Sequence, residues 1–202
     1  RNPRARHQAP LTIDDVLASP VQSSPLHTLD CCLVTDGAGA VVVTSAERAP
    51  DLRQKAAFVL GAGSSTTHSM ISAMPDLVVT PAAVSGPNAF AMAQVKPSEV
   101  DAAQLYDSFT ITVLLTLEDL GFCAKGEGGA FVASGAIGPG GSLPVNTNGG
   151  GLSCTHPGMY GMFLLVEAAR RIRGGDDVNV AHGCGGVLSA TGTVVLGSAA
   201  TL

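Results

Sequence analysis

The sequence has few aromatic and few charged side chains. Its 202 residues include no tryptophan and two tyrosines, and 13% of residues are charged against 46% hydrophobic. This hydrophobic share is enough for one sizeable globular domain or two small ones. No apolar run reaches the roughly 18 to 20 residues of a membrane span, and no signal-peptide pattern opens the chain. We therefore expect a globular, cytoplasmic protein with no membrane span.

Positive charge is also scarce, because 11 Lys and Arg residues stand against 16 Asp and Glu residues. The basic residues cluster at only two places, Arg1, Arg4 and Arg6, and later Arg170, Arg171 and Arg173. Proteins that bind nucleic acid usually carry a broad basic patch or stripe. The sequence therefore predicts no nucleic-acid partner.

The five cysteines are odd in number and match no zinc-binding spacing. They are Cys31, Cys32, Cys123, Cys154 and Cys184. We interpret them as buried, reduced thiols and predict no metal site.

Patterns typical of strands and helices alternate along the chain, which favours an α/β fold. Thr12 caps a short helical pattern that Pro20 ends. Residues 31–45, CCLVTDGAGAVVVTS, place an Asp-Gly turn between two β-branched runs and predict a pair of buried strands. Residues 55–65 predict a strand that ends in glycines, and residues 81–94 predict a short helix.

Residues 108–122, SFTITVLLTLEDLGF, fit two patterns. Phe109, Ile111 and Val113 alternate as in a strand, whereas Phe109, Val113 and Leu117 fit one face of a helix. The length of the segment and the glycine near its end favour a mostly buried helix.

The last third of the chain gives clearer patterns. Residues 156–175 predict a helix, because apolar side chains recur on one side, basic residues fill the last turn and glycines follow. Residues 178–197 predict two strands joined by a glycine-rich turn.

Residues 145–161, VNTNGGGLSCTHPGMYG, combine three glycines, a histidine before a proline, and one of the two tyrosines. Glycines allow the backbone to approach another group closely. Asn148 before the glycines and His156 after them could aim amide and imidazole donors at one carbonyl oxygen, which stabilises developing negative charge. A purely structural turn is the alternative reading.

This stretch resembles the thiolase superfamily pattern VNxNGGxIAxGHP over residues 145–157, without a gap. Two further segments resemble the superfamily in the same order, VKPSEVDAAQLYDSF at 95–109 and HGCGGVLSATG at 182–192. The resemblance covers about residues 30–202. It implies a thiolase-like α/β fold of αβαβα layers built from two similar halves.

The resemblance also implies that the chain holds mainly the second half. Residues 1–80 are expected to be the end of the N-terminal half with a loop segment, and residues 81–202 the C-terminal thiolase-like domain. The nucleophilic cysteine of thiolases is expected upstream of Arg1.

The chain departs from the thiolase pattern at three positions. Tyr106 stands where thiolases have Asn and their sterol-carrier-type relatives have His. His182 stands, in our alignment, where thiolases carry their second cysteine. The HPGMYG segment is one residue shorter than in thiolases and brings Tyr160 beside the site.

With these departures, the chain resembles the lipid-transfer-protein-like thiolase homologues that act as acyl-CoA retro-aldolases in steroid side-chain degradation. The resemblance implies cleavage of a β-hydroxyacyl-CoA into a ketone or aldehyde and a shorter acyl-CoA. It implies no cofactor beyond the coenzyme A thioester substrate, a homodimer, and a small OB-fold partner protein in a heterotetramer. A thiolase-type acyltransferase with an upstream cysteine and a non-catalytic acyl-binding scaffold are the alternatives.

The catalytic residues implied are Tyr106, Tyr160, His156, Asn148 and His182. The two tyrosines are expected to transfer protons, and Asn148 and His156 to hold the enolate oxygen. A tyrosine that serves as a base at neutral pH needs its pKa lowered by roughly 2 to 3 units. Which tyrosine is the base stays open, and buried core tyrosines with one satisfied hydroxyl are the alternative. Asp107 is expected to orient a neighbour or to cap the following helix.

Overall fold

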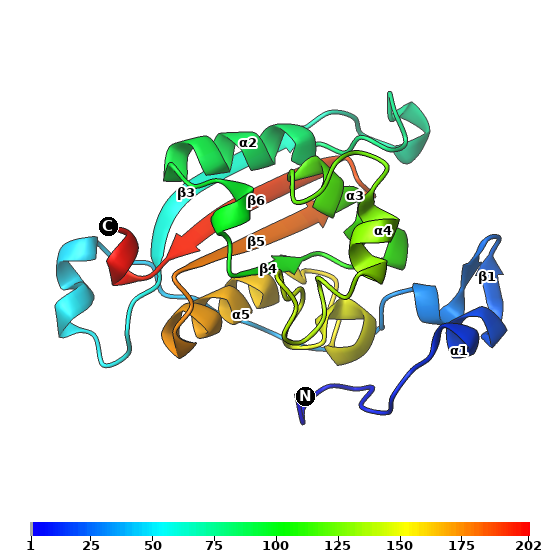
Figure 1. Cartoon of the computed structure of the whole chain (residues 1–202), viewed down its shortest axis with the longest axis horizontal. Coiled ribbons are helices and arrows are strands. Elements are labelled where there is room, and N and C mark those ends of the chain that lie inside the picture. The colour runs from blue at the N-terminus through cyan, green and yellow to red at the C-terminus, as the bar shows by residue number, and fades with distance from the viewer. Residues whose placement is uncertain (1) are drawn as a thin grey trace.

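A four-stranded sheet forms the centre of the computed structural model, which describes residues 2–202 (Figure 1). Its strands, in spatial order, are β3 (Phe58–Thr66), β6 (Ala190–Gly197), β5 (Val178–Gly185) and β4 (Ala102–Leu105). β4 and β5 are parallel, and β6 is antiparallel to both of its neighbours. The sheet is therefore mixed.

Helices cover both faces of this sheet, so that the described chain has three layers (Figure 1). Helices α2 (Ala82–Ala93) and α3 (Thr110–Asp119) pack on one face, and α5 (Gly161–Gly174) packs on the other. Helix α4 (Gly128–Ala133) follows α3 and contacts it. The expected α/β fold class is confirmed.

Helix α5 shows how the sequence produces these layers. Leu164, Ala168 and Ile172 recur every four residues and are buried against the sheet. Arg171 and Arg173 lie in the last turn, where the helix dipole favours positive charge. Gly175, with a φ of 121°, ends the helix.

The ambiguous segment at 108–122 is a helix, as predicted. Phe109 has an extended backbone and stands just before α3. The helix begins at the next residue, Thr110, so the strand-like alternation of Phe109, Ile111 and Val113 does not correspond to a strand. Val113 and Leu117 are buried in the cluster that α2 and the sheet share. Val113 and Leu117 are four residues apart, so a helix places both on the face that packs against this cluster.

The predicted strand pair at 31–45 is wrong. No regular secondary structure forms from Leu33 to Ser45, and Val42 and Val43 are 94% and 83% exposed. A β-branched run forms a strand only where a neighbouring strand accepts its hydrogen bonds, and none lies beside it in residues 2–202. The segment instead runs past the start of α5, where Gly37 lies against Phe163.

The N-terminal segment carries α1 (Ile13–Ala18) and a small hairpin of β1 (Val21–Ser23) and β2 (Leu26–His27). Thr12 caps α1, as predicted, by accepting a hydrogen bond from the Asp15 N–H. Short 3₁₀ turns lie at Thr28–Asp30, Ala46–Asp51, Ile71–Ala73, Pro97–Glu99 and Ala199–Thr201, and a π-helical turn lies at Gly150–Cys154.

The five cysteines are free, as expected, but partly rather than fully buried. Within residues 2–202, no helix has the length and apolar character to cross a membrane. The division at residue 80 stays a prediction, although β3, which precedes it, belongs to the same sheet as β4, β5 and β6.

Candidate active site

Four of the five candidate side chains meet at the carboxyl end of β4. The Tyr106 hydroxyl lies 2.7 Å from His156 Nε2, and the Tyr160 hydroxyl lies 3.3 Å from Asn148 Oδ1. The ring centroids of Tyr106 and Tyr160 are 5.9 Å apart. The structure thus brings both tyrosines, the amide and the imidazole into one cluster.

Backbone pairing explains why residues about 40 positions apart meet here. Val145 forms a parallel bridge to Ala103 of β4, and the Asn146 N–H donates to the Ala103 carbonyl over 3.0 Å. Asn146 Oδ1 accepts a hydrogen bond of 2.7 Å from the N–H of Leu105. The glycine turn that follows is therefore held beside the residue after β4, which is Tyr106.

The glycine run receives the carboxylate of Asp107. The N–H groups of Gly151 and Leu152 donate to Asp107 over 2.7 and 3.1 Å. A Cβ at Gly150 would collide with Asp107 Oδ2, and its φ of 66° also favours glycine. Of the two roles expected for Asp107, the structure supports orienting a neighbour, namely this turn.

Burial raises the pKa of Asp107 to about 6, although the hydrogen bonds from Gly151 and Leu152 oppose the rise. The turn is also held from its other side. Leu33 N–H donates to the Gly151 carbonyl over 2.9 Å, and His156 N–H donates to Thr35 Oγ1 over 2.9 Å. The backbone that carries the imidazole is therefore held in place by two separate segments.

The Tyr106 and His156 pair is neutral at neutral pH. Burial, with the nearby thiols of Cys32 and Cys184, raises the pKa of Tyr106, and burial lowers the pKa of His156. This is opposite to the lowered tyrosine pKa that a phenolate base would need. When the imidazole carries its proton on Nδ1, its Nε2 accepts the hydrogen bond from the phenol. The phenol can then pass its proton to His156 while it takes a proton from a bound molecule.

The Tyr160 and Asn148 pair lies deeper. Tyr160 is fully buried, and burial, followed by the charge of Asp107, raises its pKa. Its hydroxyl therefore stays protonated and donates to Asn148 Oδ1, which also accepts from the Gly150 N–H over 2.9 Å. With two donors on Oδ1, the amide nitrogen is the part of Asn148 left to donate to a ligand.

The structure does not bring His182 into this cluster. Its imidazole is 1% exposed and lies 2.8 Å from Thr193 Oγ1, which in turn lies 2.9 Å from Ser85 Oγ of α2. Side chains alternate between the faces of a strand, so His182 faces α2 and the next residue, Gly183, faces α5. The expectation that His182 belongs to the catalytic cluster is therefore corrected. Burial lowers the His182 pKa to about 4, which suits a neutral structural residue.

A hollow of about 470 Å³ lies beside the two tyrosines. Cys184 and the residues around it at the β5 and β6 turn line it, together with Met159 and Met162 at the start of α5. Tyr106 is partly exposed, whereas Tyr160 has no exposed surface. The phenol that a bound molecule can reach directly is therefore that of Tyr106.

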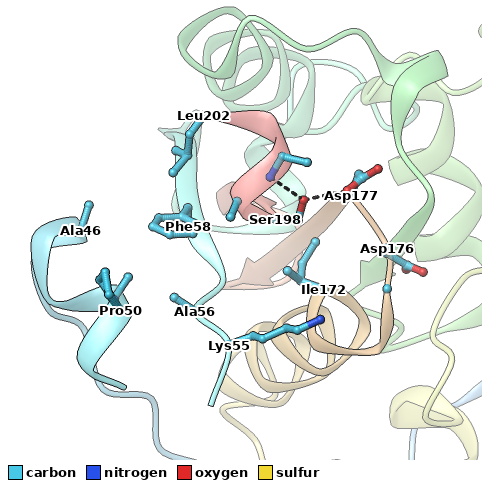
Figure 2. A pocket seen from close by; sticks show the side chains of 14 residues that line it. Ala46, Pro50, Lys55, Ala56, Phe58, Ile172, Asp176, Asp177, Ser198 and Leu202 are labelled. Atoms are coloured by element: carbon cyan, nitrogen blue, oxygen red, sulfur yellow. Dashed lines mark hydrogen bonds between the residues drawn. The ribbon is translucent and has the colours of Figure 1, made fainter. Parts of the chain in front are cut away.

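A larger hollow of about 650 Å³ lies at the other end of α5 and β6 (Figure 2). Phe58 and Ile172 contribute apolar walls, and the Asp177 carboxylate accepts a hydrogen bond of 2.7 Å from Ser198 (Figure 2). It contains none of the site candidates. The smaller hollow is the better candidate because the hydrogen-bonded tyrosine borders it.

Within residues 2–202, no three His, Cys, Asp or Glu side chains come together in a way that could hold a metal ion. Sequence reasoning overlooked Gly183 and the lining methionines. The sequence did contain a signal for Gly183. Side chains alternate between the two faces of a strand, so the residue after His182 lies on the opposite face.

Comparison with known proteins agrees with this fold. Residues 63–198 match the family described as thiolase C-terminal domain-like. The chain belongs to this family, and the resemblance to the thiolase superfamily is confirmed.

Three relatives are particularly similar. The chain is 42% identical over 200 residues to the 17-hydroxy-3-oxo-4-pregnene-20-carboxyl-CoA lyase of Mycobacterium tuberculosis, covering 96% of the chain and 51% of that protein. It is 39% identical over 205 residues to the steroid side-chain-cleaving aldolase of Thermomonospora curvata, covering 96% of the chain and 50% of that protein. The solved Ltp2-ChsH2(DUF35) aldolase superposes with a TM-score of 0.86 at 32% identity, covering 98% of the chain and 54% of that structure's chain. The chain thus spans about half the length of these relatives.

Proposed function

We propose that this chain forms the tyrosine-bearing half of an acyl-CoA retro-aldolase. The enzyme would cleave a β-hydroxyacyl-CoA of a steroid or lipid side chain into a ketone or aldehyde and a shorter acyl-CoA. The observation that carries the proposal is the hydrogen bond of 2.7 Å between Tyr106 and His156 at the edge of the hollow. The names of the Mycobacterium tuberculosis lyase and the Thermomonospora curvata aldolase support the reaction class.

The reaction needs one proton removed and one returned. Tyr106 takes the proton of the substrate's β-hydroxyl and passes its own proton to His156. The hydroxyl oxygen then forms a carbonyl, the bond between the α and β carbons breaks, and its electron pair becomes the thioester enolate. The proton returns through the same pair to the α carbon, which gives the shorter acyl-CoA and regenerates the enzyme.

Asn148 is proposed to stabilise the enolate oxygen. Its amide nitrogen is the donor left after Oδ1 accepts hydrogen bonds from Gly150 N–H and the Tyr160 hydroxyl. A fixed donor of this kind is typically worth roughly 3 to 4 kcal/mol in the transition state. Tyr160 therefore acts as the protonated residue that orients Asn148, and not as the base.

The same proposal extends to partners and location. The aldolase that superposes on this chain is named as a complex, Ltp2-ChsH2(DUF35), which supports a partner protein for this chain. We propose that this partner is a small OB-fold protein. A homodimer, a cytoplasmic location and the absence of a cofactor other than the coenzyme A substrate belong to this proposal. The free cysteines suit a reducing compartment.

The test uses the natural full-length protein, isolated with any partner still bound. A β-hydroxyacyl-CoA is added, and the carbonyl product and the shorter acyl-CoA are measured by mass spectrometry. We expect the two products in equal amounts and no acyl group on the protein. Thiolysis of a 3-oxoacyl-CoA through an acylated cysteine, without cleavage of the hydroxy substrate, would instead identify an acyltransferase.

A further inference from the structure

Gln104 of β4 is a fully buried polar side chain that the proposed chemistry does not use. Its neighbours Ala103 and Leu105 pack in the cluster on the α2 and α3 side of the sheet. Side chains alternate along a strand, so Gln104 faces α5, the side on which Tyr106 packs. An apolar side chain would fill this place without the cost of removing an amide from water. The amide therefore needs an explanation in the group that it bonds.

That group is Thr147, the residue directly before Asn148. Gln104 Oε1 accepts the Thr147 N–H over 3.2 Å, and Gln104 Nε2 donates to Thr147 Oγ1 over 3.3 Å. Because the amide oxygen is used by the backbone N–H, the amide nitrogen is the group that faces the hydroxyl. Thr147 Oγ1 accepts there and gives its one proton to Glu167 Oε1, over 2.8 Å. The three side chains thus form a directed chain of hydrogen bonds.

This chain connects three elements, and each of them carries one side chain of the site. β4, which lies against α5 (Figure 1), leads directly into Tyr106. Thr147 lies in the turn that carries Asn148, and Glu167 lies on α5, which begins directly after Tyr160. Buried polar networks of this kind fix one arrangement of the groups that they join. The chain therefore fixes the backbone of the turn relative to both tyrosines.

We propose that Gln104, Thr147 and Glu167 are positioning residues that fix the direction in which the Asn148 amide points. This inference rests on the proposed function, in which that amide donates to the enolate oxygen. A displacement of about 1 Å at a reacting group can lower a rate by about 100-fold, and supporting hydrogen bonds prevent it. None of the three residues lines the hollow, so their loss should appear in kcat and not in KM.

The test compares Thr147→Val, which keeps the shape of the side chain, with Thr147→Ser, which keeps its hydroxyl. Both variants are made in the full-length protein with any partner still bound, and cleavage of one β-hydroxyacyl-CoA is measured. We expect Thr147→Val to lower kcat by roughly 10- to 100-fold while KM stays within about 3-fold of wild type. Thr147→Ser should keep kcat within about 3-fold, because the hydrogen-bond chain is intact.

Thr110→Val is the matched control. Thr110 is also partly buried and donates to a carboxylate, Asp30 Oδ1, over 2.8 Å, but it does not line the hollow. Each valine variant loses one hydrogen bond of the same kind, so similar changes in Tm are expected. A kcat loss in Thr147→Val no larger than in Thr110→Val would overturn the proposal. An equal loss in Thr147→Ser, or a raised KM in place of a lowered kcat, would overturn it as well.

Gln104→Leu tests whether the hydrogen-bond chain acts as one unit. It should lower kcat about as far as Thr147→Val does. The double variant should be no slower than either single variant, because residues of one network are not additive. Losses that multiply in the double variant would show two independent effects and contradict the chain.

Binding distinguishes this inference from the lyase proposal. Two compounds that cannot be cleaved are used, a CoA thioester without the β-hydroxyl and a nitronate analogue whose charged oxygen imitates the enolate oxygen. Calorimetry measures their Kd, and wild type should bind the nitronate at least about 10-fold more tightly. Thr147→Val should lose most of this preference while its Kd for the thioester stays unchanged.

This result supports the positioning role even if wild type cleaves nothing. If wild type cleaves its substrate and Thr147→Val keeps the full preference for the nitronate, the positioning role is wrong and the lyase proposal stands. If wild type shows no preference, Asn148 is not a donor to the enolate oxygen and the positioning role is also overturned.

Discussion

The Tyr106 hydroxyl and His156 Nε2 form a hydrogen bond of 2.7 Å between a phenol whose pKa is raised and an imidazole whose pKa is lowered, both mainly by burial. Neither group carries a charge at neutral pH. The pair can therefore move a proton only in a concerted way, with the imidazole accepting as the phenol takes a proton from the substrate.

The two tyrosines are expected to respond differently to loss of the hydroxyl. Tyr106→Phe should lower kcat by roughly 10²- to 10⁴-fold with little change in KM, since it removes the proton acceptor. Tyr160→Phe should lower kcat less, because it removes only the second donor on Asn148 Oδ1. Steady-state kinetics on one β-hydroxyacyl-CoA measure both effects, and a larger loss in Tyr160→Phe would reverse the assignment.

The pH dependence of kcat/KM should report His156. Burial lowers the pKa of His156 below the ordinary value of 6.5. Above this lowered pKa the imidazole is neutral and can accept a proton. Activity should rise with pH through that value and then stay level toward neutral pH. His156→Gln should be much slower and should lack this acidic limb. Asp107 titrates at about 6, so a limb that persists in His156→Gln but is lost in Asp107→Asn would assign it to the carboxylate instead.

Local patterns predicted α2, α3, α5, β3, β5 and β6, but they did not indicate β4, α4 or the β1–β2 hairpin. The strand prediction for Leu33–Ser45 was wrong because its valines are exposed and pair with no strand among the described residues. A local pattern does not show whether a segment has a strand partner. The motif spacing correctly brought Tyr106, Asn148, His156 and Tyr160 together. Which face of the strand His182 occupies depends on its register in the sheet, which the motif spacing does not fix, and a one-residue shift moves a side chain to the opposite face.

Gly150 should be intolerant of a side chain. Its φ is 66°, and a Cβ would strike the Asp107 carboxylate, so Gly150→Ala should lower the free energy of unfolding by about 2 kcal/mol or more. Gly129→Ala, where the Cβ meets open space, is the control. Chemical denaturation of both variants measures the difference. Equal stability would show that Asp107 does not hold the turn.

His182 should matter for acid stability and not for chemistry. Burial lowers its pKa from 6.5 to about 4, so the folded state resists protonation and its contribution to stability is lost as pH falls from about 6.5 toward 4. That loss is on the order of 3 kcal/mol. His182→Asn should retain kcat at neutral pH while showing a shallower fall in unfolding free energy over this range. A loss of kcat comparable to that of Tyr106→Phe would return His182 to the catalytic set.

Cys184 lines the hollow beside Tyr106, and its replacement separates the lyase from an acyltransferase. Burial raises the pKa of its thiol, and its sulfur contacts one weak acceptor, the Gly185 carbonyl, at 3.9 Å. A thiol that acts in acid-base catalysis is expected to have a lowered pKa beside a basic group. Cys184→Ser, which keeps the size of the side chain, should therefore retain cleavage of a β-hydroxyacyl-CoA within about 3-fold, since no covalent or proton-transfer step uses the thiol. Abolished turnover with an unchanged Tm would mean that the thiol takes part in the chemistry, as in a thiolase.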